Sequence, residues 1–362
     1  MKLGIVGLPN AGKTTLFNAI MQTGAVASNY PFSTVSPNVG RVPVPDDRLA
    51  KLTEVFKPKK TTHTAVEMVD IAGLVKGASK GEGLGNQFLS YIREVDALVH
   101  VVRCFEDENV SHVYENINPV RDVETVEFEL VLSDLDLVER RLDKVIKIAR
   151  TDRAYKREEE ILTVLRDTLE DGKAARTLTW IDAEDKRIVE SIPLISVKPV
   201  LYAANVSEEG LSTEDENQKK ISDFVALQNA KMYVSCAKLE ADIAELEPEE
   251  KELFLNEMGI AENGLARLIR AGYELLGLVS FFTGNPNEVR AWTIRNGLKA
   301  PQAAGKVHGD MERGFIRAEV IQFDELASIG SYNLAKEKGM VRVEGKEYVV
   351  KDGDVILVRF NV

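Results

Sequence analysis

Residues 7–14 have the sequence Gly7-Leu8-Pro9-Asn10-Ala11-Gly12-Lys13-Thr14, and they constrain the architecture of this chain more than any other stretch. They fit the pattern G-x-x-x-x-G-K-[ST], in which the glycines let backbone N–H groups close around phosphate oxygens. The apolar run Lys2–Gly7 predicts a buried strand, and a helix is expected from about Lys13. An ordinary tight turn is the alternative, but the strand–loop–helix order favours a nucleotide-binding loop. The residues expected to hold the nucleotide are Asn10, Ala11, Gly12, Lys13, Thr14 and Thr15.

A magnesium site is predicted beside this loop. Lys13 is expected to reach the β- and γ-phosphates as a catalytic positive charge, and the Thr14 hydroxyl can coordinate Mg2+. Asp70, in the stretch Asp70-Ile71-Ala72-Gly73, ends an apolar segment that predicts a strand. A carboxylate at the end of such a strand is the group expected to hold the metal through water.

Two loops have the composition of nucleotide-sensing switches. Asn29–Thr34 separates Thr14 from Asp70, and Thr34 is expected to give the metal a second hydroxyl, although Ser33 and Ser36 stand nearby. Gly77–Asn86 contains four glycines and is interpreted as a second switch, with a surface loop of no switching role as the alternative. The switch residues are Gly73, Leu74, Gly77, Gly81, Gly83 and Gly85.

The predicted base-binding end of the site departs from guanine recognition. A guanine site normally carries N-K-x-D, whose Asp accepts two hydrogen bonds from guanine, but this chain has Asn205-Val206-Ser207-Glu208. Adenine presents a hydrogen-bond acceptor where guanine has a ring N–H, so a carboxylate held at that position would repel adenine. A longer Glu moves the carboxylate away, which removes the preference for guanine. Asn205 is expected to contact the base beside Val206 and Glu208, and a further base-lining loop is predicted at Ser235, Cys236 and Ala237.

The order of apolar segments predicts an α/β fold with a doubly wound, mainly parallel sheet. Further strands are expected at Ala97–Val102, Val200–Asn205 and Met232–Cys236, with helices between them. Two parts of the chain break this alternation, one in the middle and one at the C-terminal end.

The middle part predicts an inserted helical hairpin. Apolar residues alternate at spacings of four and three along a first helix and continue on a second after a link rich in Arg and Glu. Two amphipathic helices packed on the main core are the alternative. The expected seam consists of Val131, Leu135, Val138, Leu142, Val145 and Ala149, then Ile161, Leu165 and Thr168 or Leu169.

The last 80 or so residues predict a small α+β domain with short strands and tight turns. Its expected strands are Val289–Ile294, Phe315–Ile321, Tyr348–Val350 and Val355–Phe360, the last two joined by the turn Lys351–Asp354.

Composition bounds the functions open to this chain. Its 362 residues include 46 Lys and Arg against 58 Asp and Glu, a formal charge of −12 that argues against charge-driven or sequence-specific DNA binding. No apolar run is long enough to span a membrane, the start does not resemble a signal peptide, and two cysteines provide no disulfide framework. A cytoplasmic protein is expected.

With its motifs in this order, the chain resembles the Obg-like ATPase (YchF) family over nearly its whole length. The resemblance rests on Gly7–Thr14, Asp70–Gly85, His100–Glu106, Asn205–Glu208 and two C-terminal runs, Gly314–Ile321 and Arg359–Val362. It implies a P-loop G domain at 1–122 and 199–277, a coiled-coil insert at 123–198, and a ubiquitin-like β-grasp (TGS) domain at 278–362. It also implies ATP preferred over GTP, ribosome binding and slow hydrolysis.

The resemblance adds two candidate residue roles. In this family an apolar residue replaces the water-orienting Gln of Ras-type GTPases, as Leu74 does here. His112 matches a histidine considered as a substitute, since a neutral imidazole can orient water, and a surface histidine is the alternative. His100 lies in an apolar strand and is interpreted as a core residue. Asn10 matches the Asn that helps to hold K+ in related potassium-dependent G proteins.

A ribosome could be met through local basic surfaces despite the net acidity. The stretch Glu139–Glu158 carries twice as many bases as acids, and a solvated helix face with internal ion pairs is the alternative. The bases are Arg140, Arg141, Lys144, Lys147, Arg150, Arg153, Lys156 and Arg157, and the C-terminal part adds Arg290, Arg295, Lys299, Lys306, Arg313 and Arg317.

The function expected is a magnesium-dependent ATP-hydrolysing switch that binds the ribosome, through large-subunit rRNA or protein, and modulates translation or a stress response. A GTPase of the Obg type and a non-catalytic, ATP-gated ribosome-binding module are the alternatives. A P-loop kinase is disfavoured because D-x-x-G and N-x-x-E have no role there.

Overall fold

The computed structural model describes residues 1–22, 26–28, 37–71, 73, 77, 84–257 and 264–361. The chain divides into two units, Met1–Val42 with Glu67–Leu265, and Pro43–Val66 with Ala266–Val362. Within the described residues, no helix is both long and apolar enough to cross a membrane.

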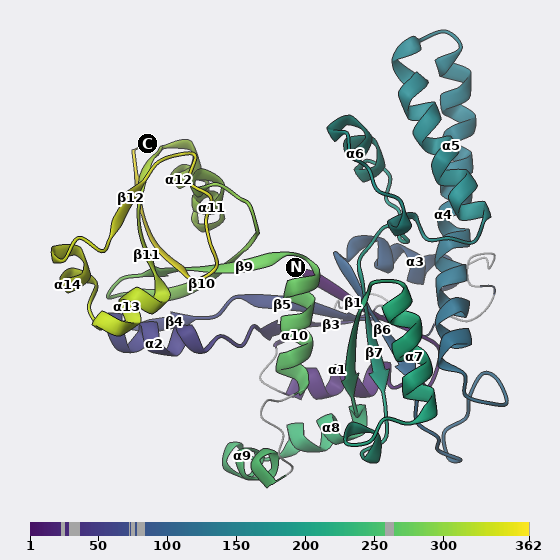
Figure 1. Ribbon diagram of the computed structural model, residues 1–362, viewed down its shortest axis with the longest axis horizontal. Coiled ribbons are helices and arrows are strands. Elements are labelled where there is room, and N and C mark those ends of the chain that lie inside the picture. Colours follow the sequence, from purple (N-terminus) through teal and green to yellow (C-terminus); the bar gives the residue numbers. More distant parts are fainter. Residues whose placement is uncertain are drawn as a thin grey trace. The chain divides into compact units, whose positions relative to one another are not determined.

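The first unit is built on a seven-stranded sheet (Figure 1), in which β1, β5, β6, β7 and β8 run parallel and β2 is antiparallel to β3. This confirms the predicted doubly wound, mainly parallel sheet. In sheet order the strands are β2 (Val26–Ser28), β3 (Asn38–Pro43), β5 (Ala65–Asp70), β1 (Lys2–Val6), β6 (Ala97–Arg103), β7 (Val200–Asn205) and β8 (Lys231–Ser235).

Helices cover this sheet and complete its core. Apolar side chains of α3, α7 and the start of α4 pack against strands β1, β5, β6 and β7. Strands β1, β6 and β7 are almost wholly buried, as is typical of parallel strands covered on both faces. The helices of this unit are α1 (Lys13–Gln22), α3 (Leu84–Glu94), α4 (Pro119–Ala149), α7 (Glu216–Leu227), α8 (Ala237–Glu245) and α9 (Pro248–Glu257). Helix α10 (Gly264–Leu275) begins at the end of this unit and belongs mostly to the second.

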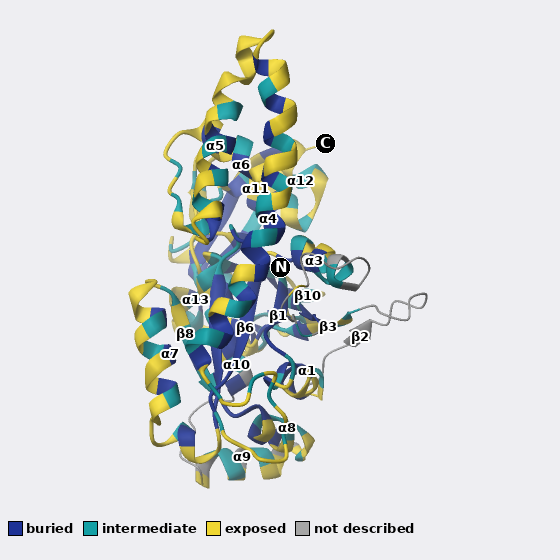
Figure 2. Cartoon of the chain, turned by 90° about the vertical axis from the view of Figure 1, so that its right-hand side faces the viewer, coloured by how far each residue is buried: buried dark blue, intermediate teal, exposed yellow. Residues whose placement is uncertain are grey.

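A helical hairpin interrupts this unit between β6 and β7. The long helix α4 begins at the N-cap Asn118, with Pro119 in its first turn, and packs against α5 (Lys156–Glu170). The short helices η1 (Arg153–Tyr155), η2 (Ala175–Thr177) and α6 (Ala183–Glu190) complete the insert. Figure 2 shows a buried stripe along the hairpin, with exposed residues on its outer sides.

Both interpretations of this insert hold, each for a part of α4. Its first turns pack on the main core through Val123, Val126 and Leu130, as the alternative supposed. From Val131 onward α4 packs against α5. Of the predicted seam, Leu135 is half-buried. The fully buried members are Val131, Val138, Leu142, Val145, Ala149, Ile161, Leu165 and Leu169.

The second unit contains a six-stranded sheet in the order β12 (Arg342–Glu344), β11 (Phe315–Gln322), β13 (Asp354–Phe360), β9 (Leu278–Gly284), β10 (Glu288–Arg295) and β4 (Lys60–Thr62). Its helices are α2 (Asp47–Phe56), α11 (Ala300–Val307), α12 (Gly309–Arg313), α13 (Phe323–Ile329) and α14 (Tyr332–Glu337). The predicted strand Tyr348–Val350 is wrong, since only Val349 forms an isolated bridge, to Lys299. The neighbouring turn is closed instead by the Lys351 N–H, which donates to Asp354.

The two units divide the chain differently from the predicted domain boundaries. The predicted nucleotide-binding domain includes residues 43–66, yet β4 pairs with β10, and Leu49 and Leu52 of α2 are fully buried against Phe282 and its neighbours. The second unit also begins earlier than residue 278, at Ala266, and the predicted insert 123–198 lies within the first unit.

Candidate functional site

The glycine-rich loop connects β1 to α1, as predicted, and its shape depends on two glycines. Gly7 has φ of 149°, and a Cβ atom there would lie 2.4 Å from the Val101 carbonyl oxygen of β6. Gly12 has φ of 96°, and its Cβ would lie 2.2 Å from Asn205 Nδ2. Side chains would therefore open the loop, so the pattern's glycines are required by close approach as well as by conformation.

Lys13 lies inside this loop at the start of α1. Its side chain is buried, and Nζ donates a hydrogen bond of 2.7 Å to the Leu8 carbonyl oxygen. Burial lowers the pKa of Lys13 to about 8, although the nearby Asp70 charge opposes this shift. A buried ammonium group at the N-terminus of a helix suits a phosphate group.

Asp70, the last residue of β5, meets Thr14 next to this loop. The Thr14 hydroxyl donates to Asp70 Oδ2 over 3.0 Å, while Oδ1 is buried and has no hydrogen-bond partner among the described residues. Burial raises the pKa of Asp70, and the hydrogen bonds from Thr14 and Asn38 and the charge of Lys13 oppose this. A buried, unpaired carboxylate oxygen beside a hydroxyl fits the hard oxygen ligands that Mg2+ prefers.

The switch elements are described only in part. Gly73 packs on the glycine-rich loop, since its Cβ would lie 2.9 Å from Pro9 N. The Gly77 N–H donates to Glu129 on α4, and Gly85 lies in α3. Thr34 and its loop, together with Leu74, Gly81 and Gly83, lie outside the described residues.

Asn205, which is predicted to contact the base, bonds through its side chain to two backbone groups of the site. Its side chain is buried, with Nδ2 donating to the Ala11 carbonyl oxygen at 3.0 Å and Oδ1 accepting from the Ala237 N–H at 2.9 Å. The amide therefore ties the glycine-rich loop to the loop after β8. The Ser235 carbonyl oxygen accepts from the Val206 N–H at 2.9 Å, which joins the end of β8 to the loop after β7.

These loops border a cleft of about 700 Å³. This volume is in the range of small-molecule sites. Of the predicted nucleotide-binding residues, Ala11, Lys13, Thr14 and Ser235 lie outside its lining. The lining consists of Asn10, Gly12, Thr15, Phe105, Glu106, Asp107, Val110, Asn205, Val206, Ser207, Glu208, Glu209, Cys236, Ala237 and Lys238.

Sequence reasoning missed the wall formed by Phe105, Glu106, Asp107 and Val110. These residues follow the carboxyl end of β6. Ligands of parallel sheets bind beyond the carboxyl ends of the strands, so this position was the available signal. Arg103 holds this wall in place, because its guanidinium donates to the carbonyl oxygens of Phe105, Asp107, Val110 and Ser111. Its Cζ also lies 4.6 Å from the centre of the Phe105 ring.

Asn10 links the glycine-rich loop to the same wall. Its backbone is left-handed, with φ of 60°, and Nδ2 donates to the carbonyl oxygen of Ser111 at 3.0 Å. Nδ2 also lies 3.1 Å from Ser111 Oγ. The side chain's carbonyl oxygen is the atom that a cation beside the phosphates would contact.

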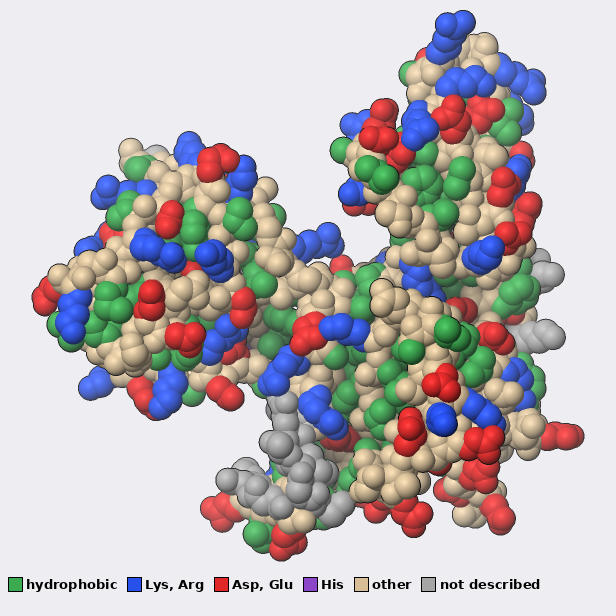
Figure 3. Space-filling model, viewed as in Figure 1, with side chains coloured by type: hydrophobic (Ala, Val, Ile, Leu, Met, Phe, Trp, Pro, Cys, Tyr) green, Lys and Arg blue, Asp and Glu red, His purple; other side chains and the backbone are tan. Residues whose placement is uncertain are grey.

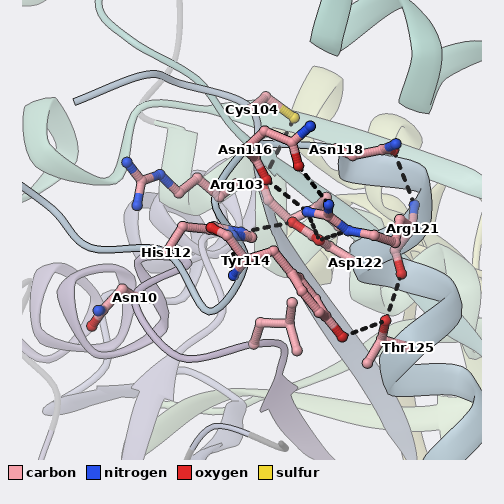
Figure 4. Close-up of polar contacts among 12 residues, drawn as sticks. Asn10, Arg103, Cys104, His112, Tyr114, Asn116, Asn118, Arg121, Asp122 and Thr125 are labelled. Carbon is pink, nitrogen blue, oxygen red and sulfur yellow. Dashed lines mark hydrogen bonds and ion pairs between the residues drawn. The ribbon is translucent and has the colours of Figure 1, made fainter. Parts of the chain in front are cut away.

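His112 is held by protein groups on both ring nitrogens (Figure 4). Nε2 lies 2.9 Å from Asp122 Oδ2, and Nδ1 lies 3.1 Å from both the N–H and the carbonyl oxygen of Tyr114. Arg121 donates to the other Asp122 oxygen and lies over the Tyr114 ring. The imidazole therefore anchors this loop to α4, and this arrangement leaves no ring nitrogen to orient the water that a catalytic role requires.

Burial keeps two further side chains singled out in the sequence, His100 and Cys236, uncharged. His100 is buried in β6 beside Tyr202, and burial lowers its pKa to about 3, so the ring is neutral. Burial raises the pKa of Cys236, which keeps its thiol protonated in the cleft wall.

A lysine enclosed by a glycine-rich turn, with an aspartate at the end of the adjoining parallel strand, defines a P-loop NTPase. Family comparisons agree with this class. Residues 2–134 match a family described as 50S ribosome-binding GTPase, and residues 278–361 match the YchF-GTPase C-terminal family, described as a protein of unknown function.

Full-length relatives identify the family. The chain is 55% identical to the Bacillus subtilis protein named ribosome-binding ATPase YchF, over 99% of each chain. It is 43% identical to Obg-like ATPase 1 of rice, covering 100% of this chain and 92% of the relative. The solved structure of the Schizosaccharomyces pombe YchF GTPase superposes with a TM-score of 0.87 at 35% identity, covering 99% of this chain and 97% of the other. The chain belongs to the YchF family.

Proposed function

We propose that this chain hydrolyses ATP in preference to GTP and uses the nucleotide to control its binding to the ribosome in the cytoplasm, where it modulates translation or a stress response. The observation that carries the proposal is the base end of the cleft, where Val206 and Glu208 stand in place of the Lys and Asp of a guanine site. The names of the Bacillus and rice relatives, both ATPases, support it.

The phosphates would lie between Lys13 and the N–H groups of Gly12–Thr14, which offset their negative charge. Thr14 and Asp70 would hold Mg2+, with Thr34 as a further candidate, and the ion would supply neutralisation of the charge that develops on the γ-phosphate. Asn205 and Ala237 position the loop after β8 against the glycine-rich loop. Because His112 is bonded elsewhere and Leu74 has no polar group, slow intrinsic hydrolysis is expected.

The base would lie between the loop Val206–Glu208 and the wall that contains Phe105, both of which line the cleft. An aromatic ring suits a base of either kind, so Phe105 adds affinity but little selectivity. Selectivity comes from Glu208, whose longer side chain moves the carboxylate from the position that matches guanine's two N–H groups.

Calorimetric titration of ATP and GTP tests the base preference. We expect tighter ATP binding, and the double variant Val206→Lys, Glu208→Asp is expected to narrow or reverse the preference. Phe105→Ala should weaken both nucleotides alike and serves as the control. Equal affinity or tighter GTP binding by the unaltered protein would favour the Obg-type GTPase. Repeating the titration in Na+ and in K+ tests the proposed cation contact of Asn10.

Single-turnover hydrolysis with and without ribosomes tests the switch. We expect slow hydrolysis that ribosomes, or their large subunits, accelerate, and Asp70→Asn should abolish the gain that Mg2+ gives. A complete lack of hydrolysis under both conditions, with ATP still bound, would favour the non-catalytic module.

A further inference from the structure

The basic residues of the helical hairpin fall into two groups that the sequence does not separate. Four of them are held by acids of the insert. Arg141 lies 2.6 Å from Glu158, Lys156 lies 2.9 Å from Glu159, Arg157 lies 2.6 Å from Asp185, and Arg140 pairs with Asp136. Their charges are largely balanced within the hairpin.

The other four are exposed and form no ion pair or side-chain hydrogen bond within the part of the chain that the structure describes. They are Lys144, Lys147, Arg150 and Arg153. Between residues 144 and 153 the sole acid is Asp152, and its carboxylate already accepts a hydrogen bond from the Ala154 N–H. We call residues 144–155 the hairpin tip. Lys and Arg side chains gather at this end of the hairpin in Figure 3.

The tip is a rigid platform for these charges. Lys144, Lys147 and Arg150 follow one another at a spacing of three residues, which places them on one side of the helix. They form a row about 9 Å long along the helix axis. The opposite side carries Leu142, Val145 and Ala149, which are buried against α5. The cations are thus directed away from the hairpin's core, on a backbone whose position that core fixes.

We propose that the hairpin tip binds the phosphate backbone of structured RNA. The proposal rests on the proposed function, in which the ribosome supplies that RNA. Unpaired cations on a helix, without acids between them, match a row of phosphates and release counterions when they bind it. The tip also exposes Ile148 and Tyr155, but its four unpaired bases outnumber them and lysine is depleted in interfaces between proteins, so a protein is the less suitable occupant.

The whole chain is acidic, with a formal charge of −12, so the tip differs in sign from the average surface. An acidic body repels RNA elsewhere and leaves the tip as the favoured approach. The binding expected is therefore local and strongly dependent on salt, without the indiscriminate affinity of a wholly basic protein.

Two triple variants with the same change in composition and charge test the proposal. The tip variant is Lys144→Gln, Lys147→Gln, Arg150→Gln, and the control is Arg166→Gln, Lys173→Gln, Lys220→Gln. The control removes three bases of the same unit, of which Arg166 is half-buried and the other two are exposed, and which pair with Asp167, Asp171 and Glu216. Binding to a fluorescein-labelled RNA duplex and to rRNA extracted from large subunits is measured by anisotropy over a range of NaCl concentrations.

The tip variant should bind RNA at least about tenfold more weakly at low salt, and the slope of log K against log salt should fall by about 2. The control variant should keep the original slope and affinity. Thermal unfolding shows whether both variants retain their fold, and slow ATP hydrolysis without ribosomes should be the same in both.

Equal RNA binding by the two variants would overturn the proposal. Loss of ribosome pelleting by the tip variant with unchanged affinity for extracted rRNA would also overturn it, in favour of a ribosomal protein as partner. Failure of the proposed ATPase function is recognised separately, because it removes hydrolysis and leaves the RNA salt slope of the tip intact.

Discussion

The backbone N–H of Gly77 donates a hydrogen bond of 2.7 Å to Oε1 of Glu129, a residue of α4 that is only 2% exposed. A second connection follows at the end of α3, where Arg93 donates to Ser133 Oγ at 2.8 Å and to the Pro193 carbonyl oxygen at 2.6 Å. Gly77, a predicted switch residue, is therefore bonded to the helical insert, and so is the end of α3. If Gly77 moves with the nucleotide, we expect α4 to transmit that movement to the hairpin.

Replacing Glu129 tests this link. Glu129→Ala removes the acceptor, so hydrogen exchange of the Gly77 amide should accelerate by about tenfold, as expected for the loss of a hydrogen bond to a charged group. Stimulation of hydrolysis by ribosomes should also fall. Glu129→Gln keeps an acceptor oxygen and should change both quantities less. Equal exchange rates in all three proteins would show that the contact transmits nothing.

A side chain at Gly12 should disrupt the nucleotide site. Gly12→Ala adds a Cβ that meets Asn205 Nδ2 in a left-handed backbone, so ATP affinity measured by calorimetry should fall at least about tenfold. Gly172→Ala is the matched control, because Gly172 has φ of 75° but no heavy atom within 4 Å of the added Cβ. It should cost about 1 kcal/mol of stability and leave ATP affinity unchanged. Similar affinities for the two variants would contradict the argument.

Asp134 is expected to secure the return of the chain from the insert. Its fully buried carboxylate accepts from the Ile195 N–H, the Ser196 N–H and the Ser196 hydroxyl, the last two at 2.7 Å. Asp134→Ala leaves these donors unpaired and should lower the free energy of unfolding by about 3 kcal/mol in urea titrations. Asp136→Ala, two residues away and exposed, should cost no more than about 0.5 kcal/mol. Comparable losses would mean that burial of the carboxylate is unimportant.

His100 should make stability depend on pH. Burial lowers its pKa in the folded protein to about 3, below the ordinary value of 6.5, so the unfolded chain binds a proton that the folded chain excludes. The stability that this difference in pKa contributes is fully present above pH 6.5 and is lost as the pH falls toward 3. At pH 5 the loss amounts to about 2 kcal/mol. Urea titrations at pH 7 and pH 5 measure it. His100→Leu should lose less stability on acidification than the unaltered protein, and an equal loss would rule out this group as the cause.

Local patterns in the sequence were sufficient for much of the fold and for the phosphate end of the site. Gly7–Thr14 and the aspartate at the end of a strand could be predicted because the chemistry needs particular residues at fixed spacing. The seam from Val131 to Ala149 could be predicted because helix periodicity places its members on one side. The base preference and the partner depend on groups that such patterns do not position, and they stay proposals.

The tertiary structure decided what depends on contacts between distant residues. Residues 43–66 join the second unit because β4 pairs with β10, more than 200 positions away in the chain. Asn205 serves the glycine-rich loop because the sheet brings its amide to Ala11, 194 positions away. The division of the hairpin's bases into paired and unpaired groups also depends on partners from other helices, such as Asp185 for Arg157. The sequence determines which groups are present and their local periodicity, whereas burial and pairing arise only when the folded chain brings remote segments together.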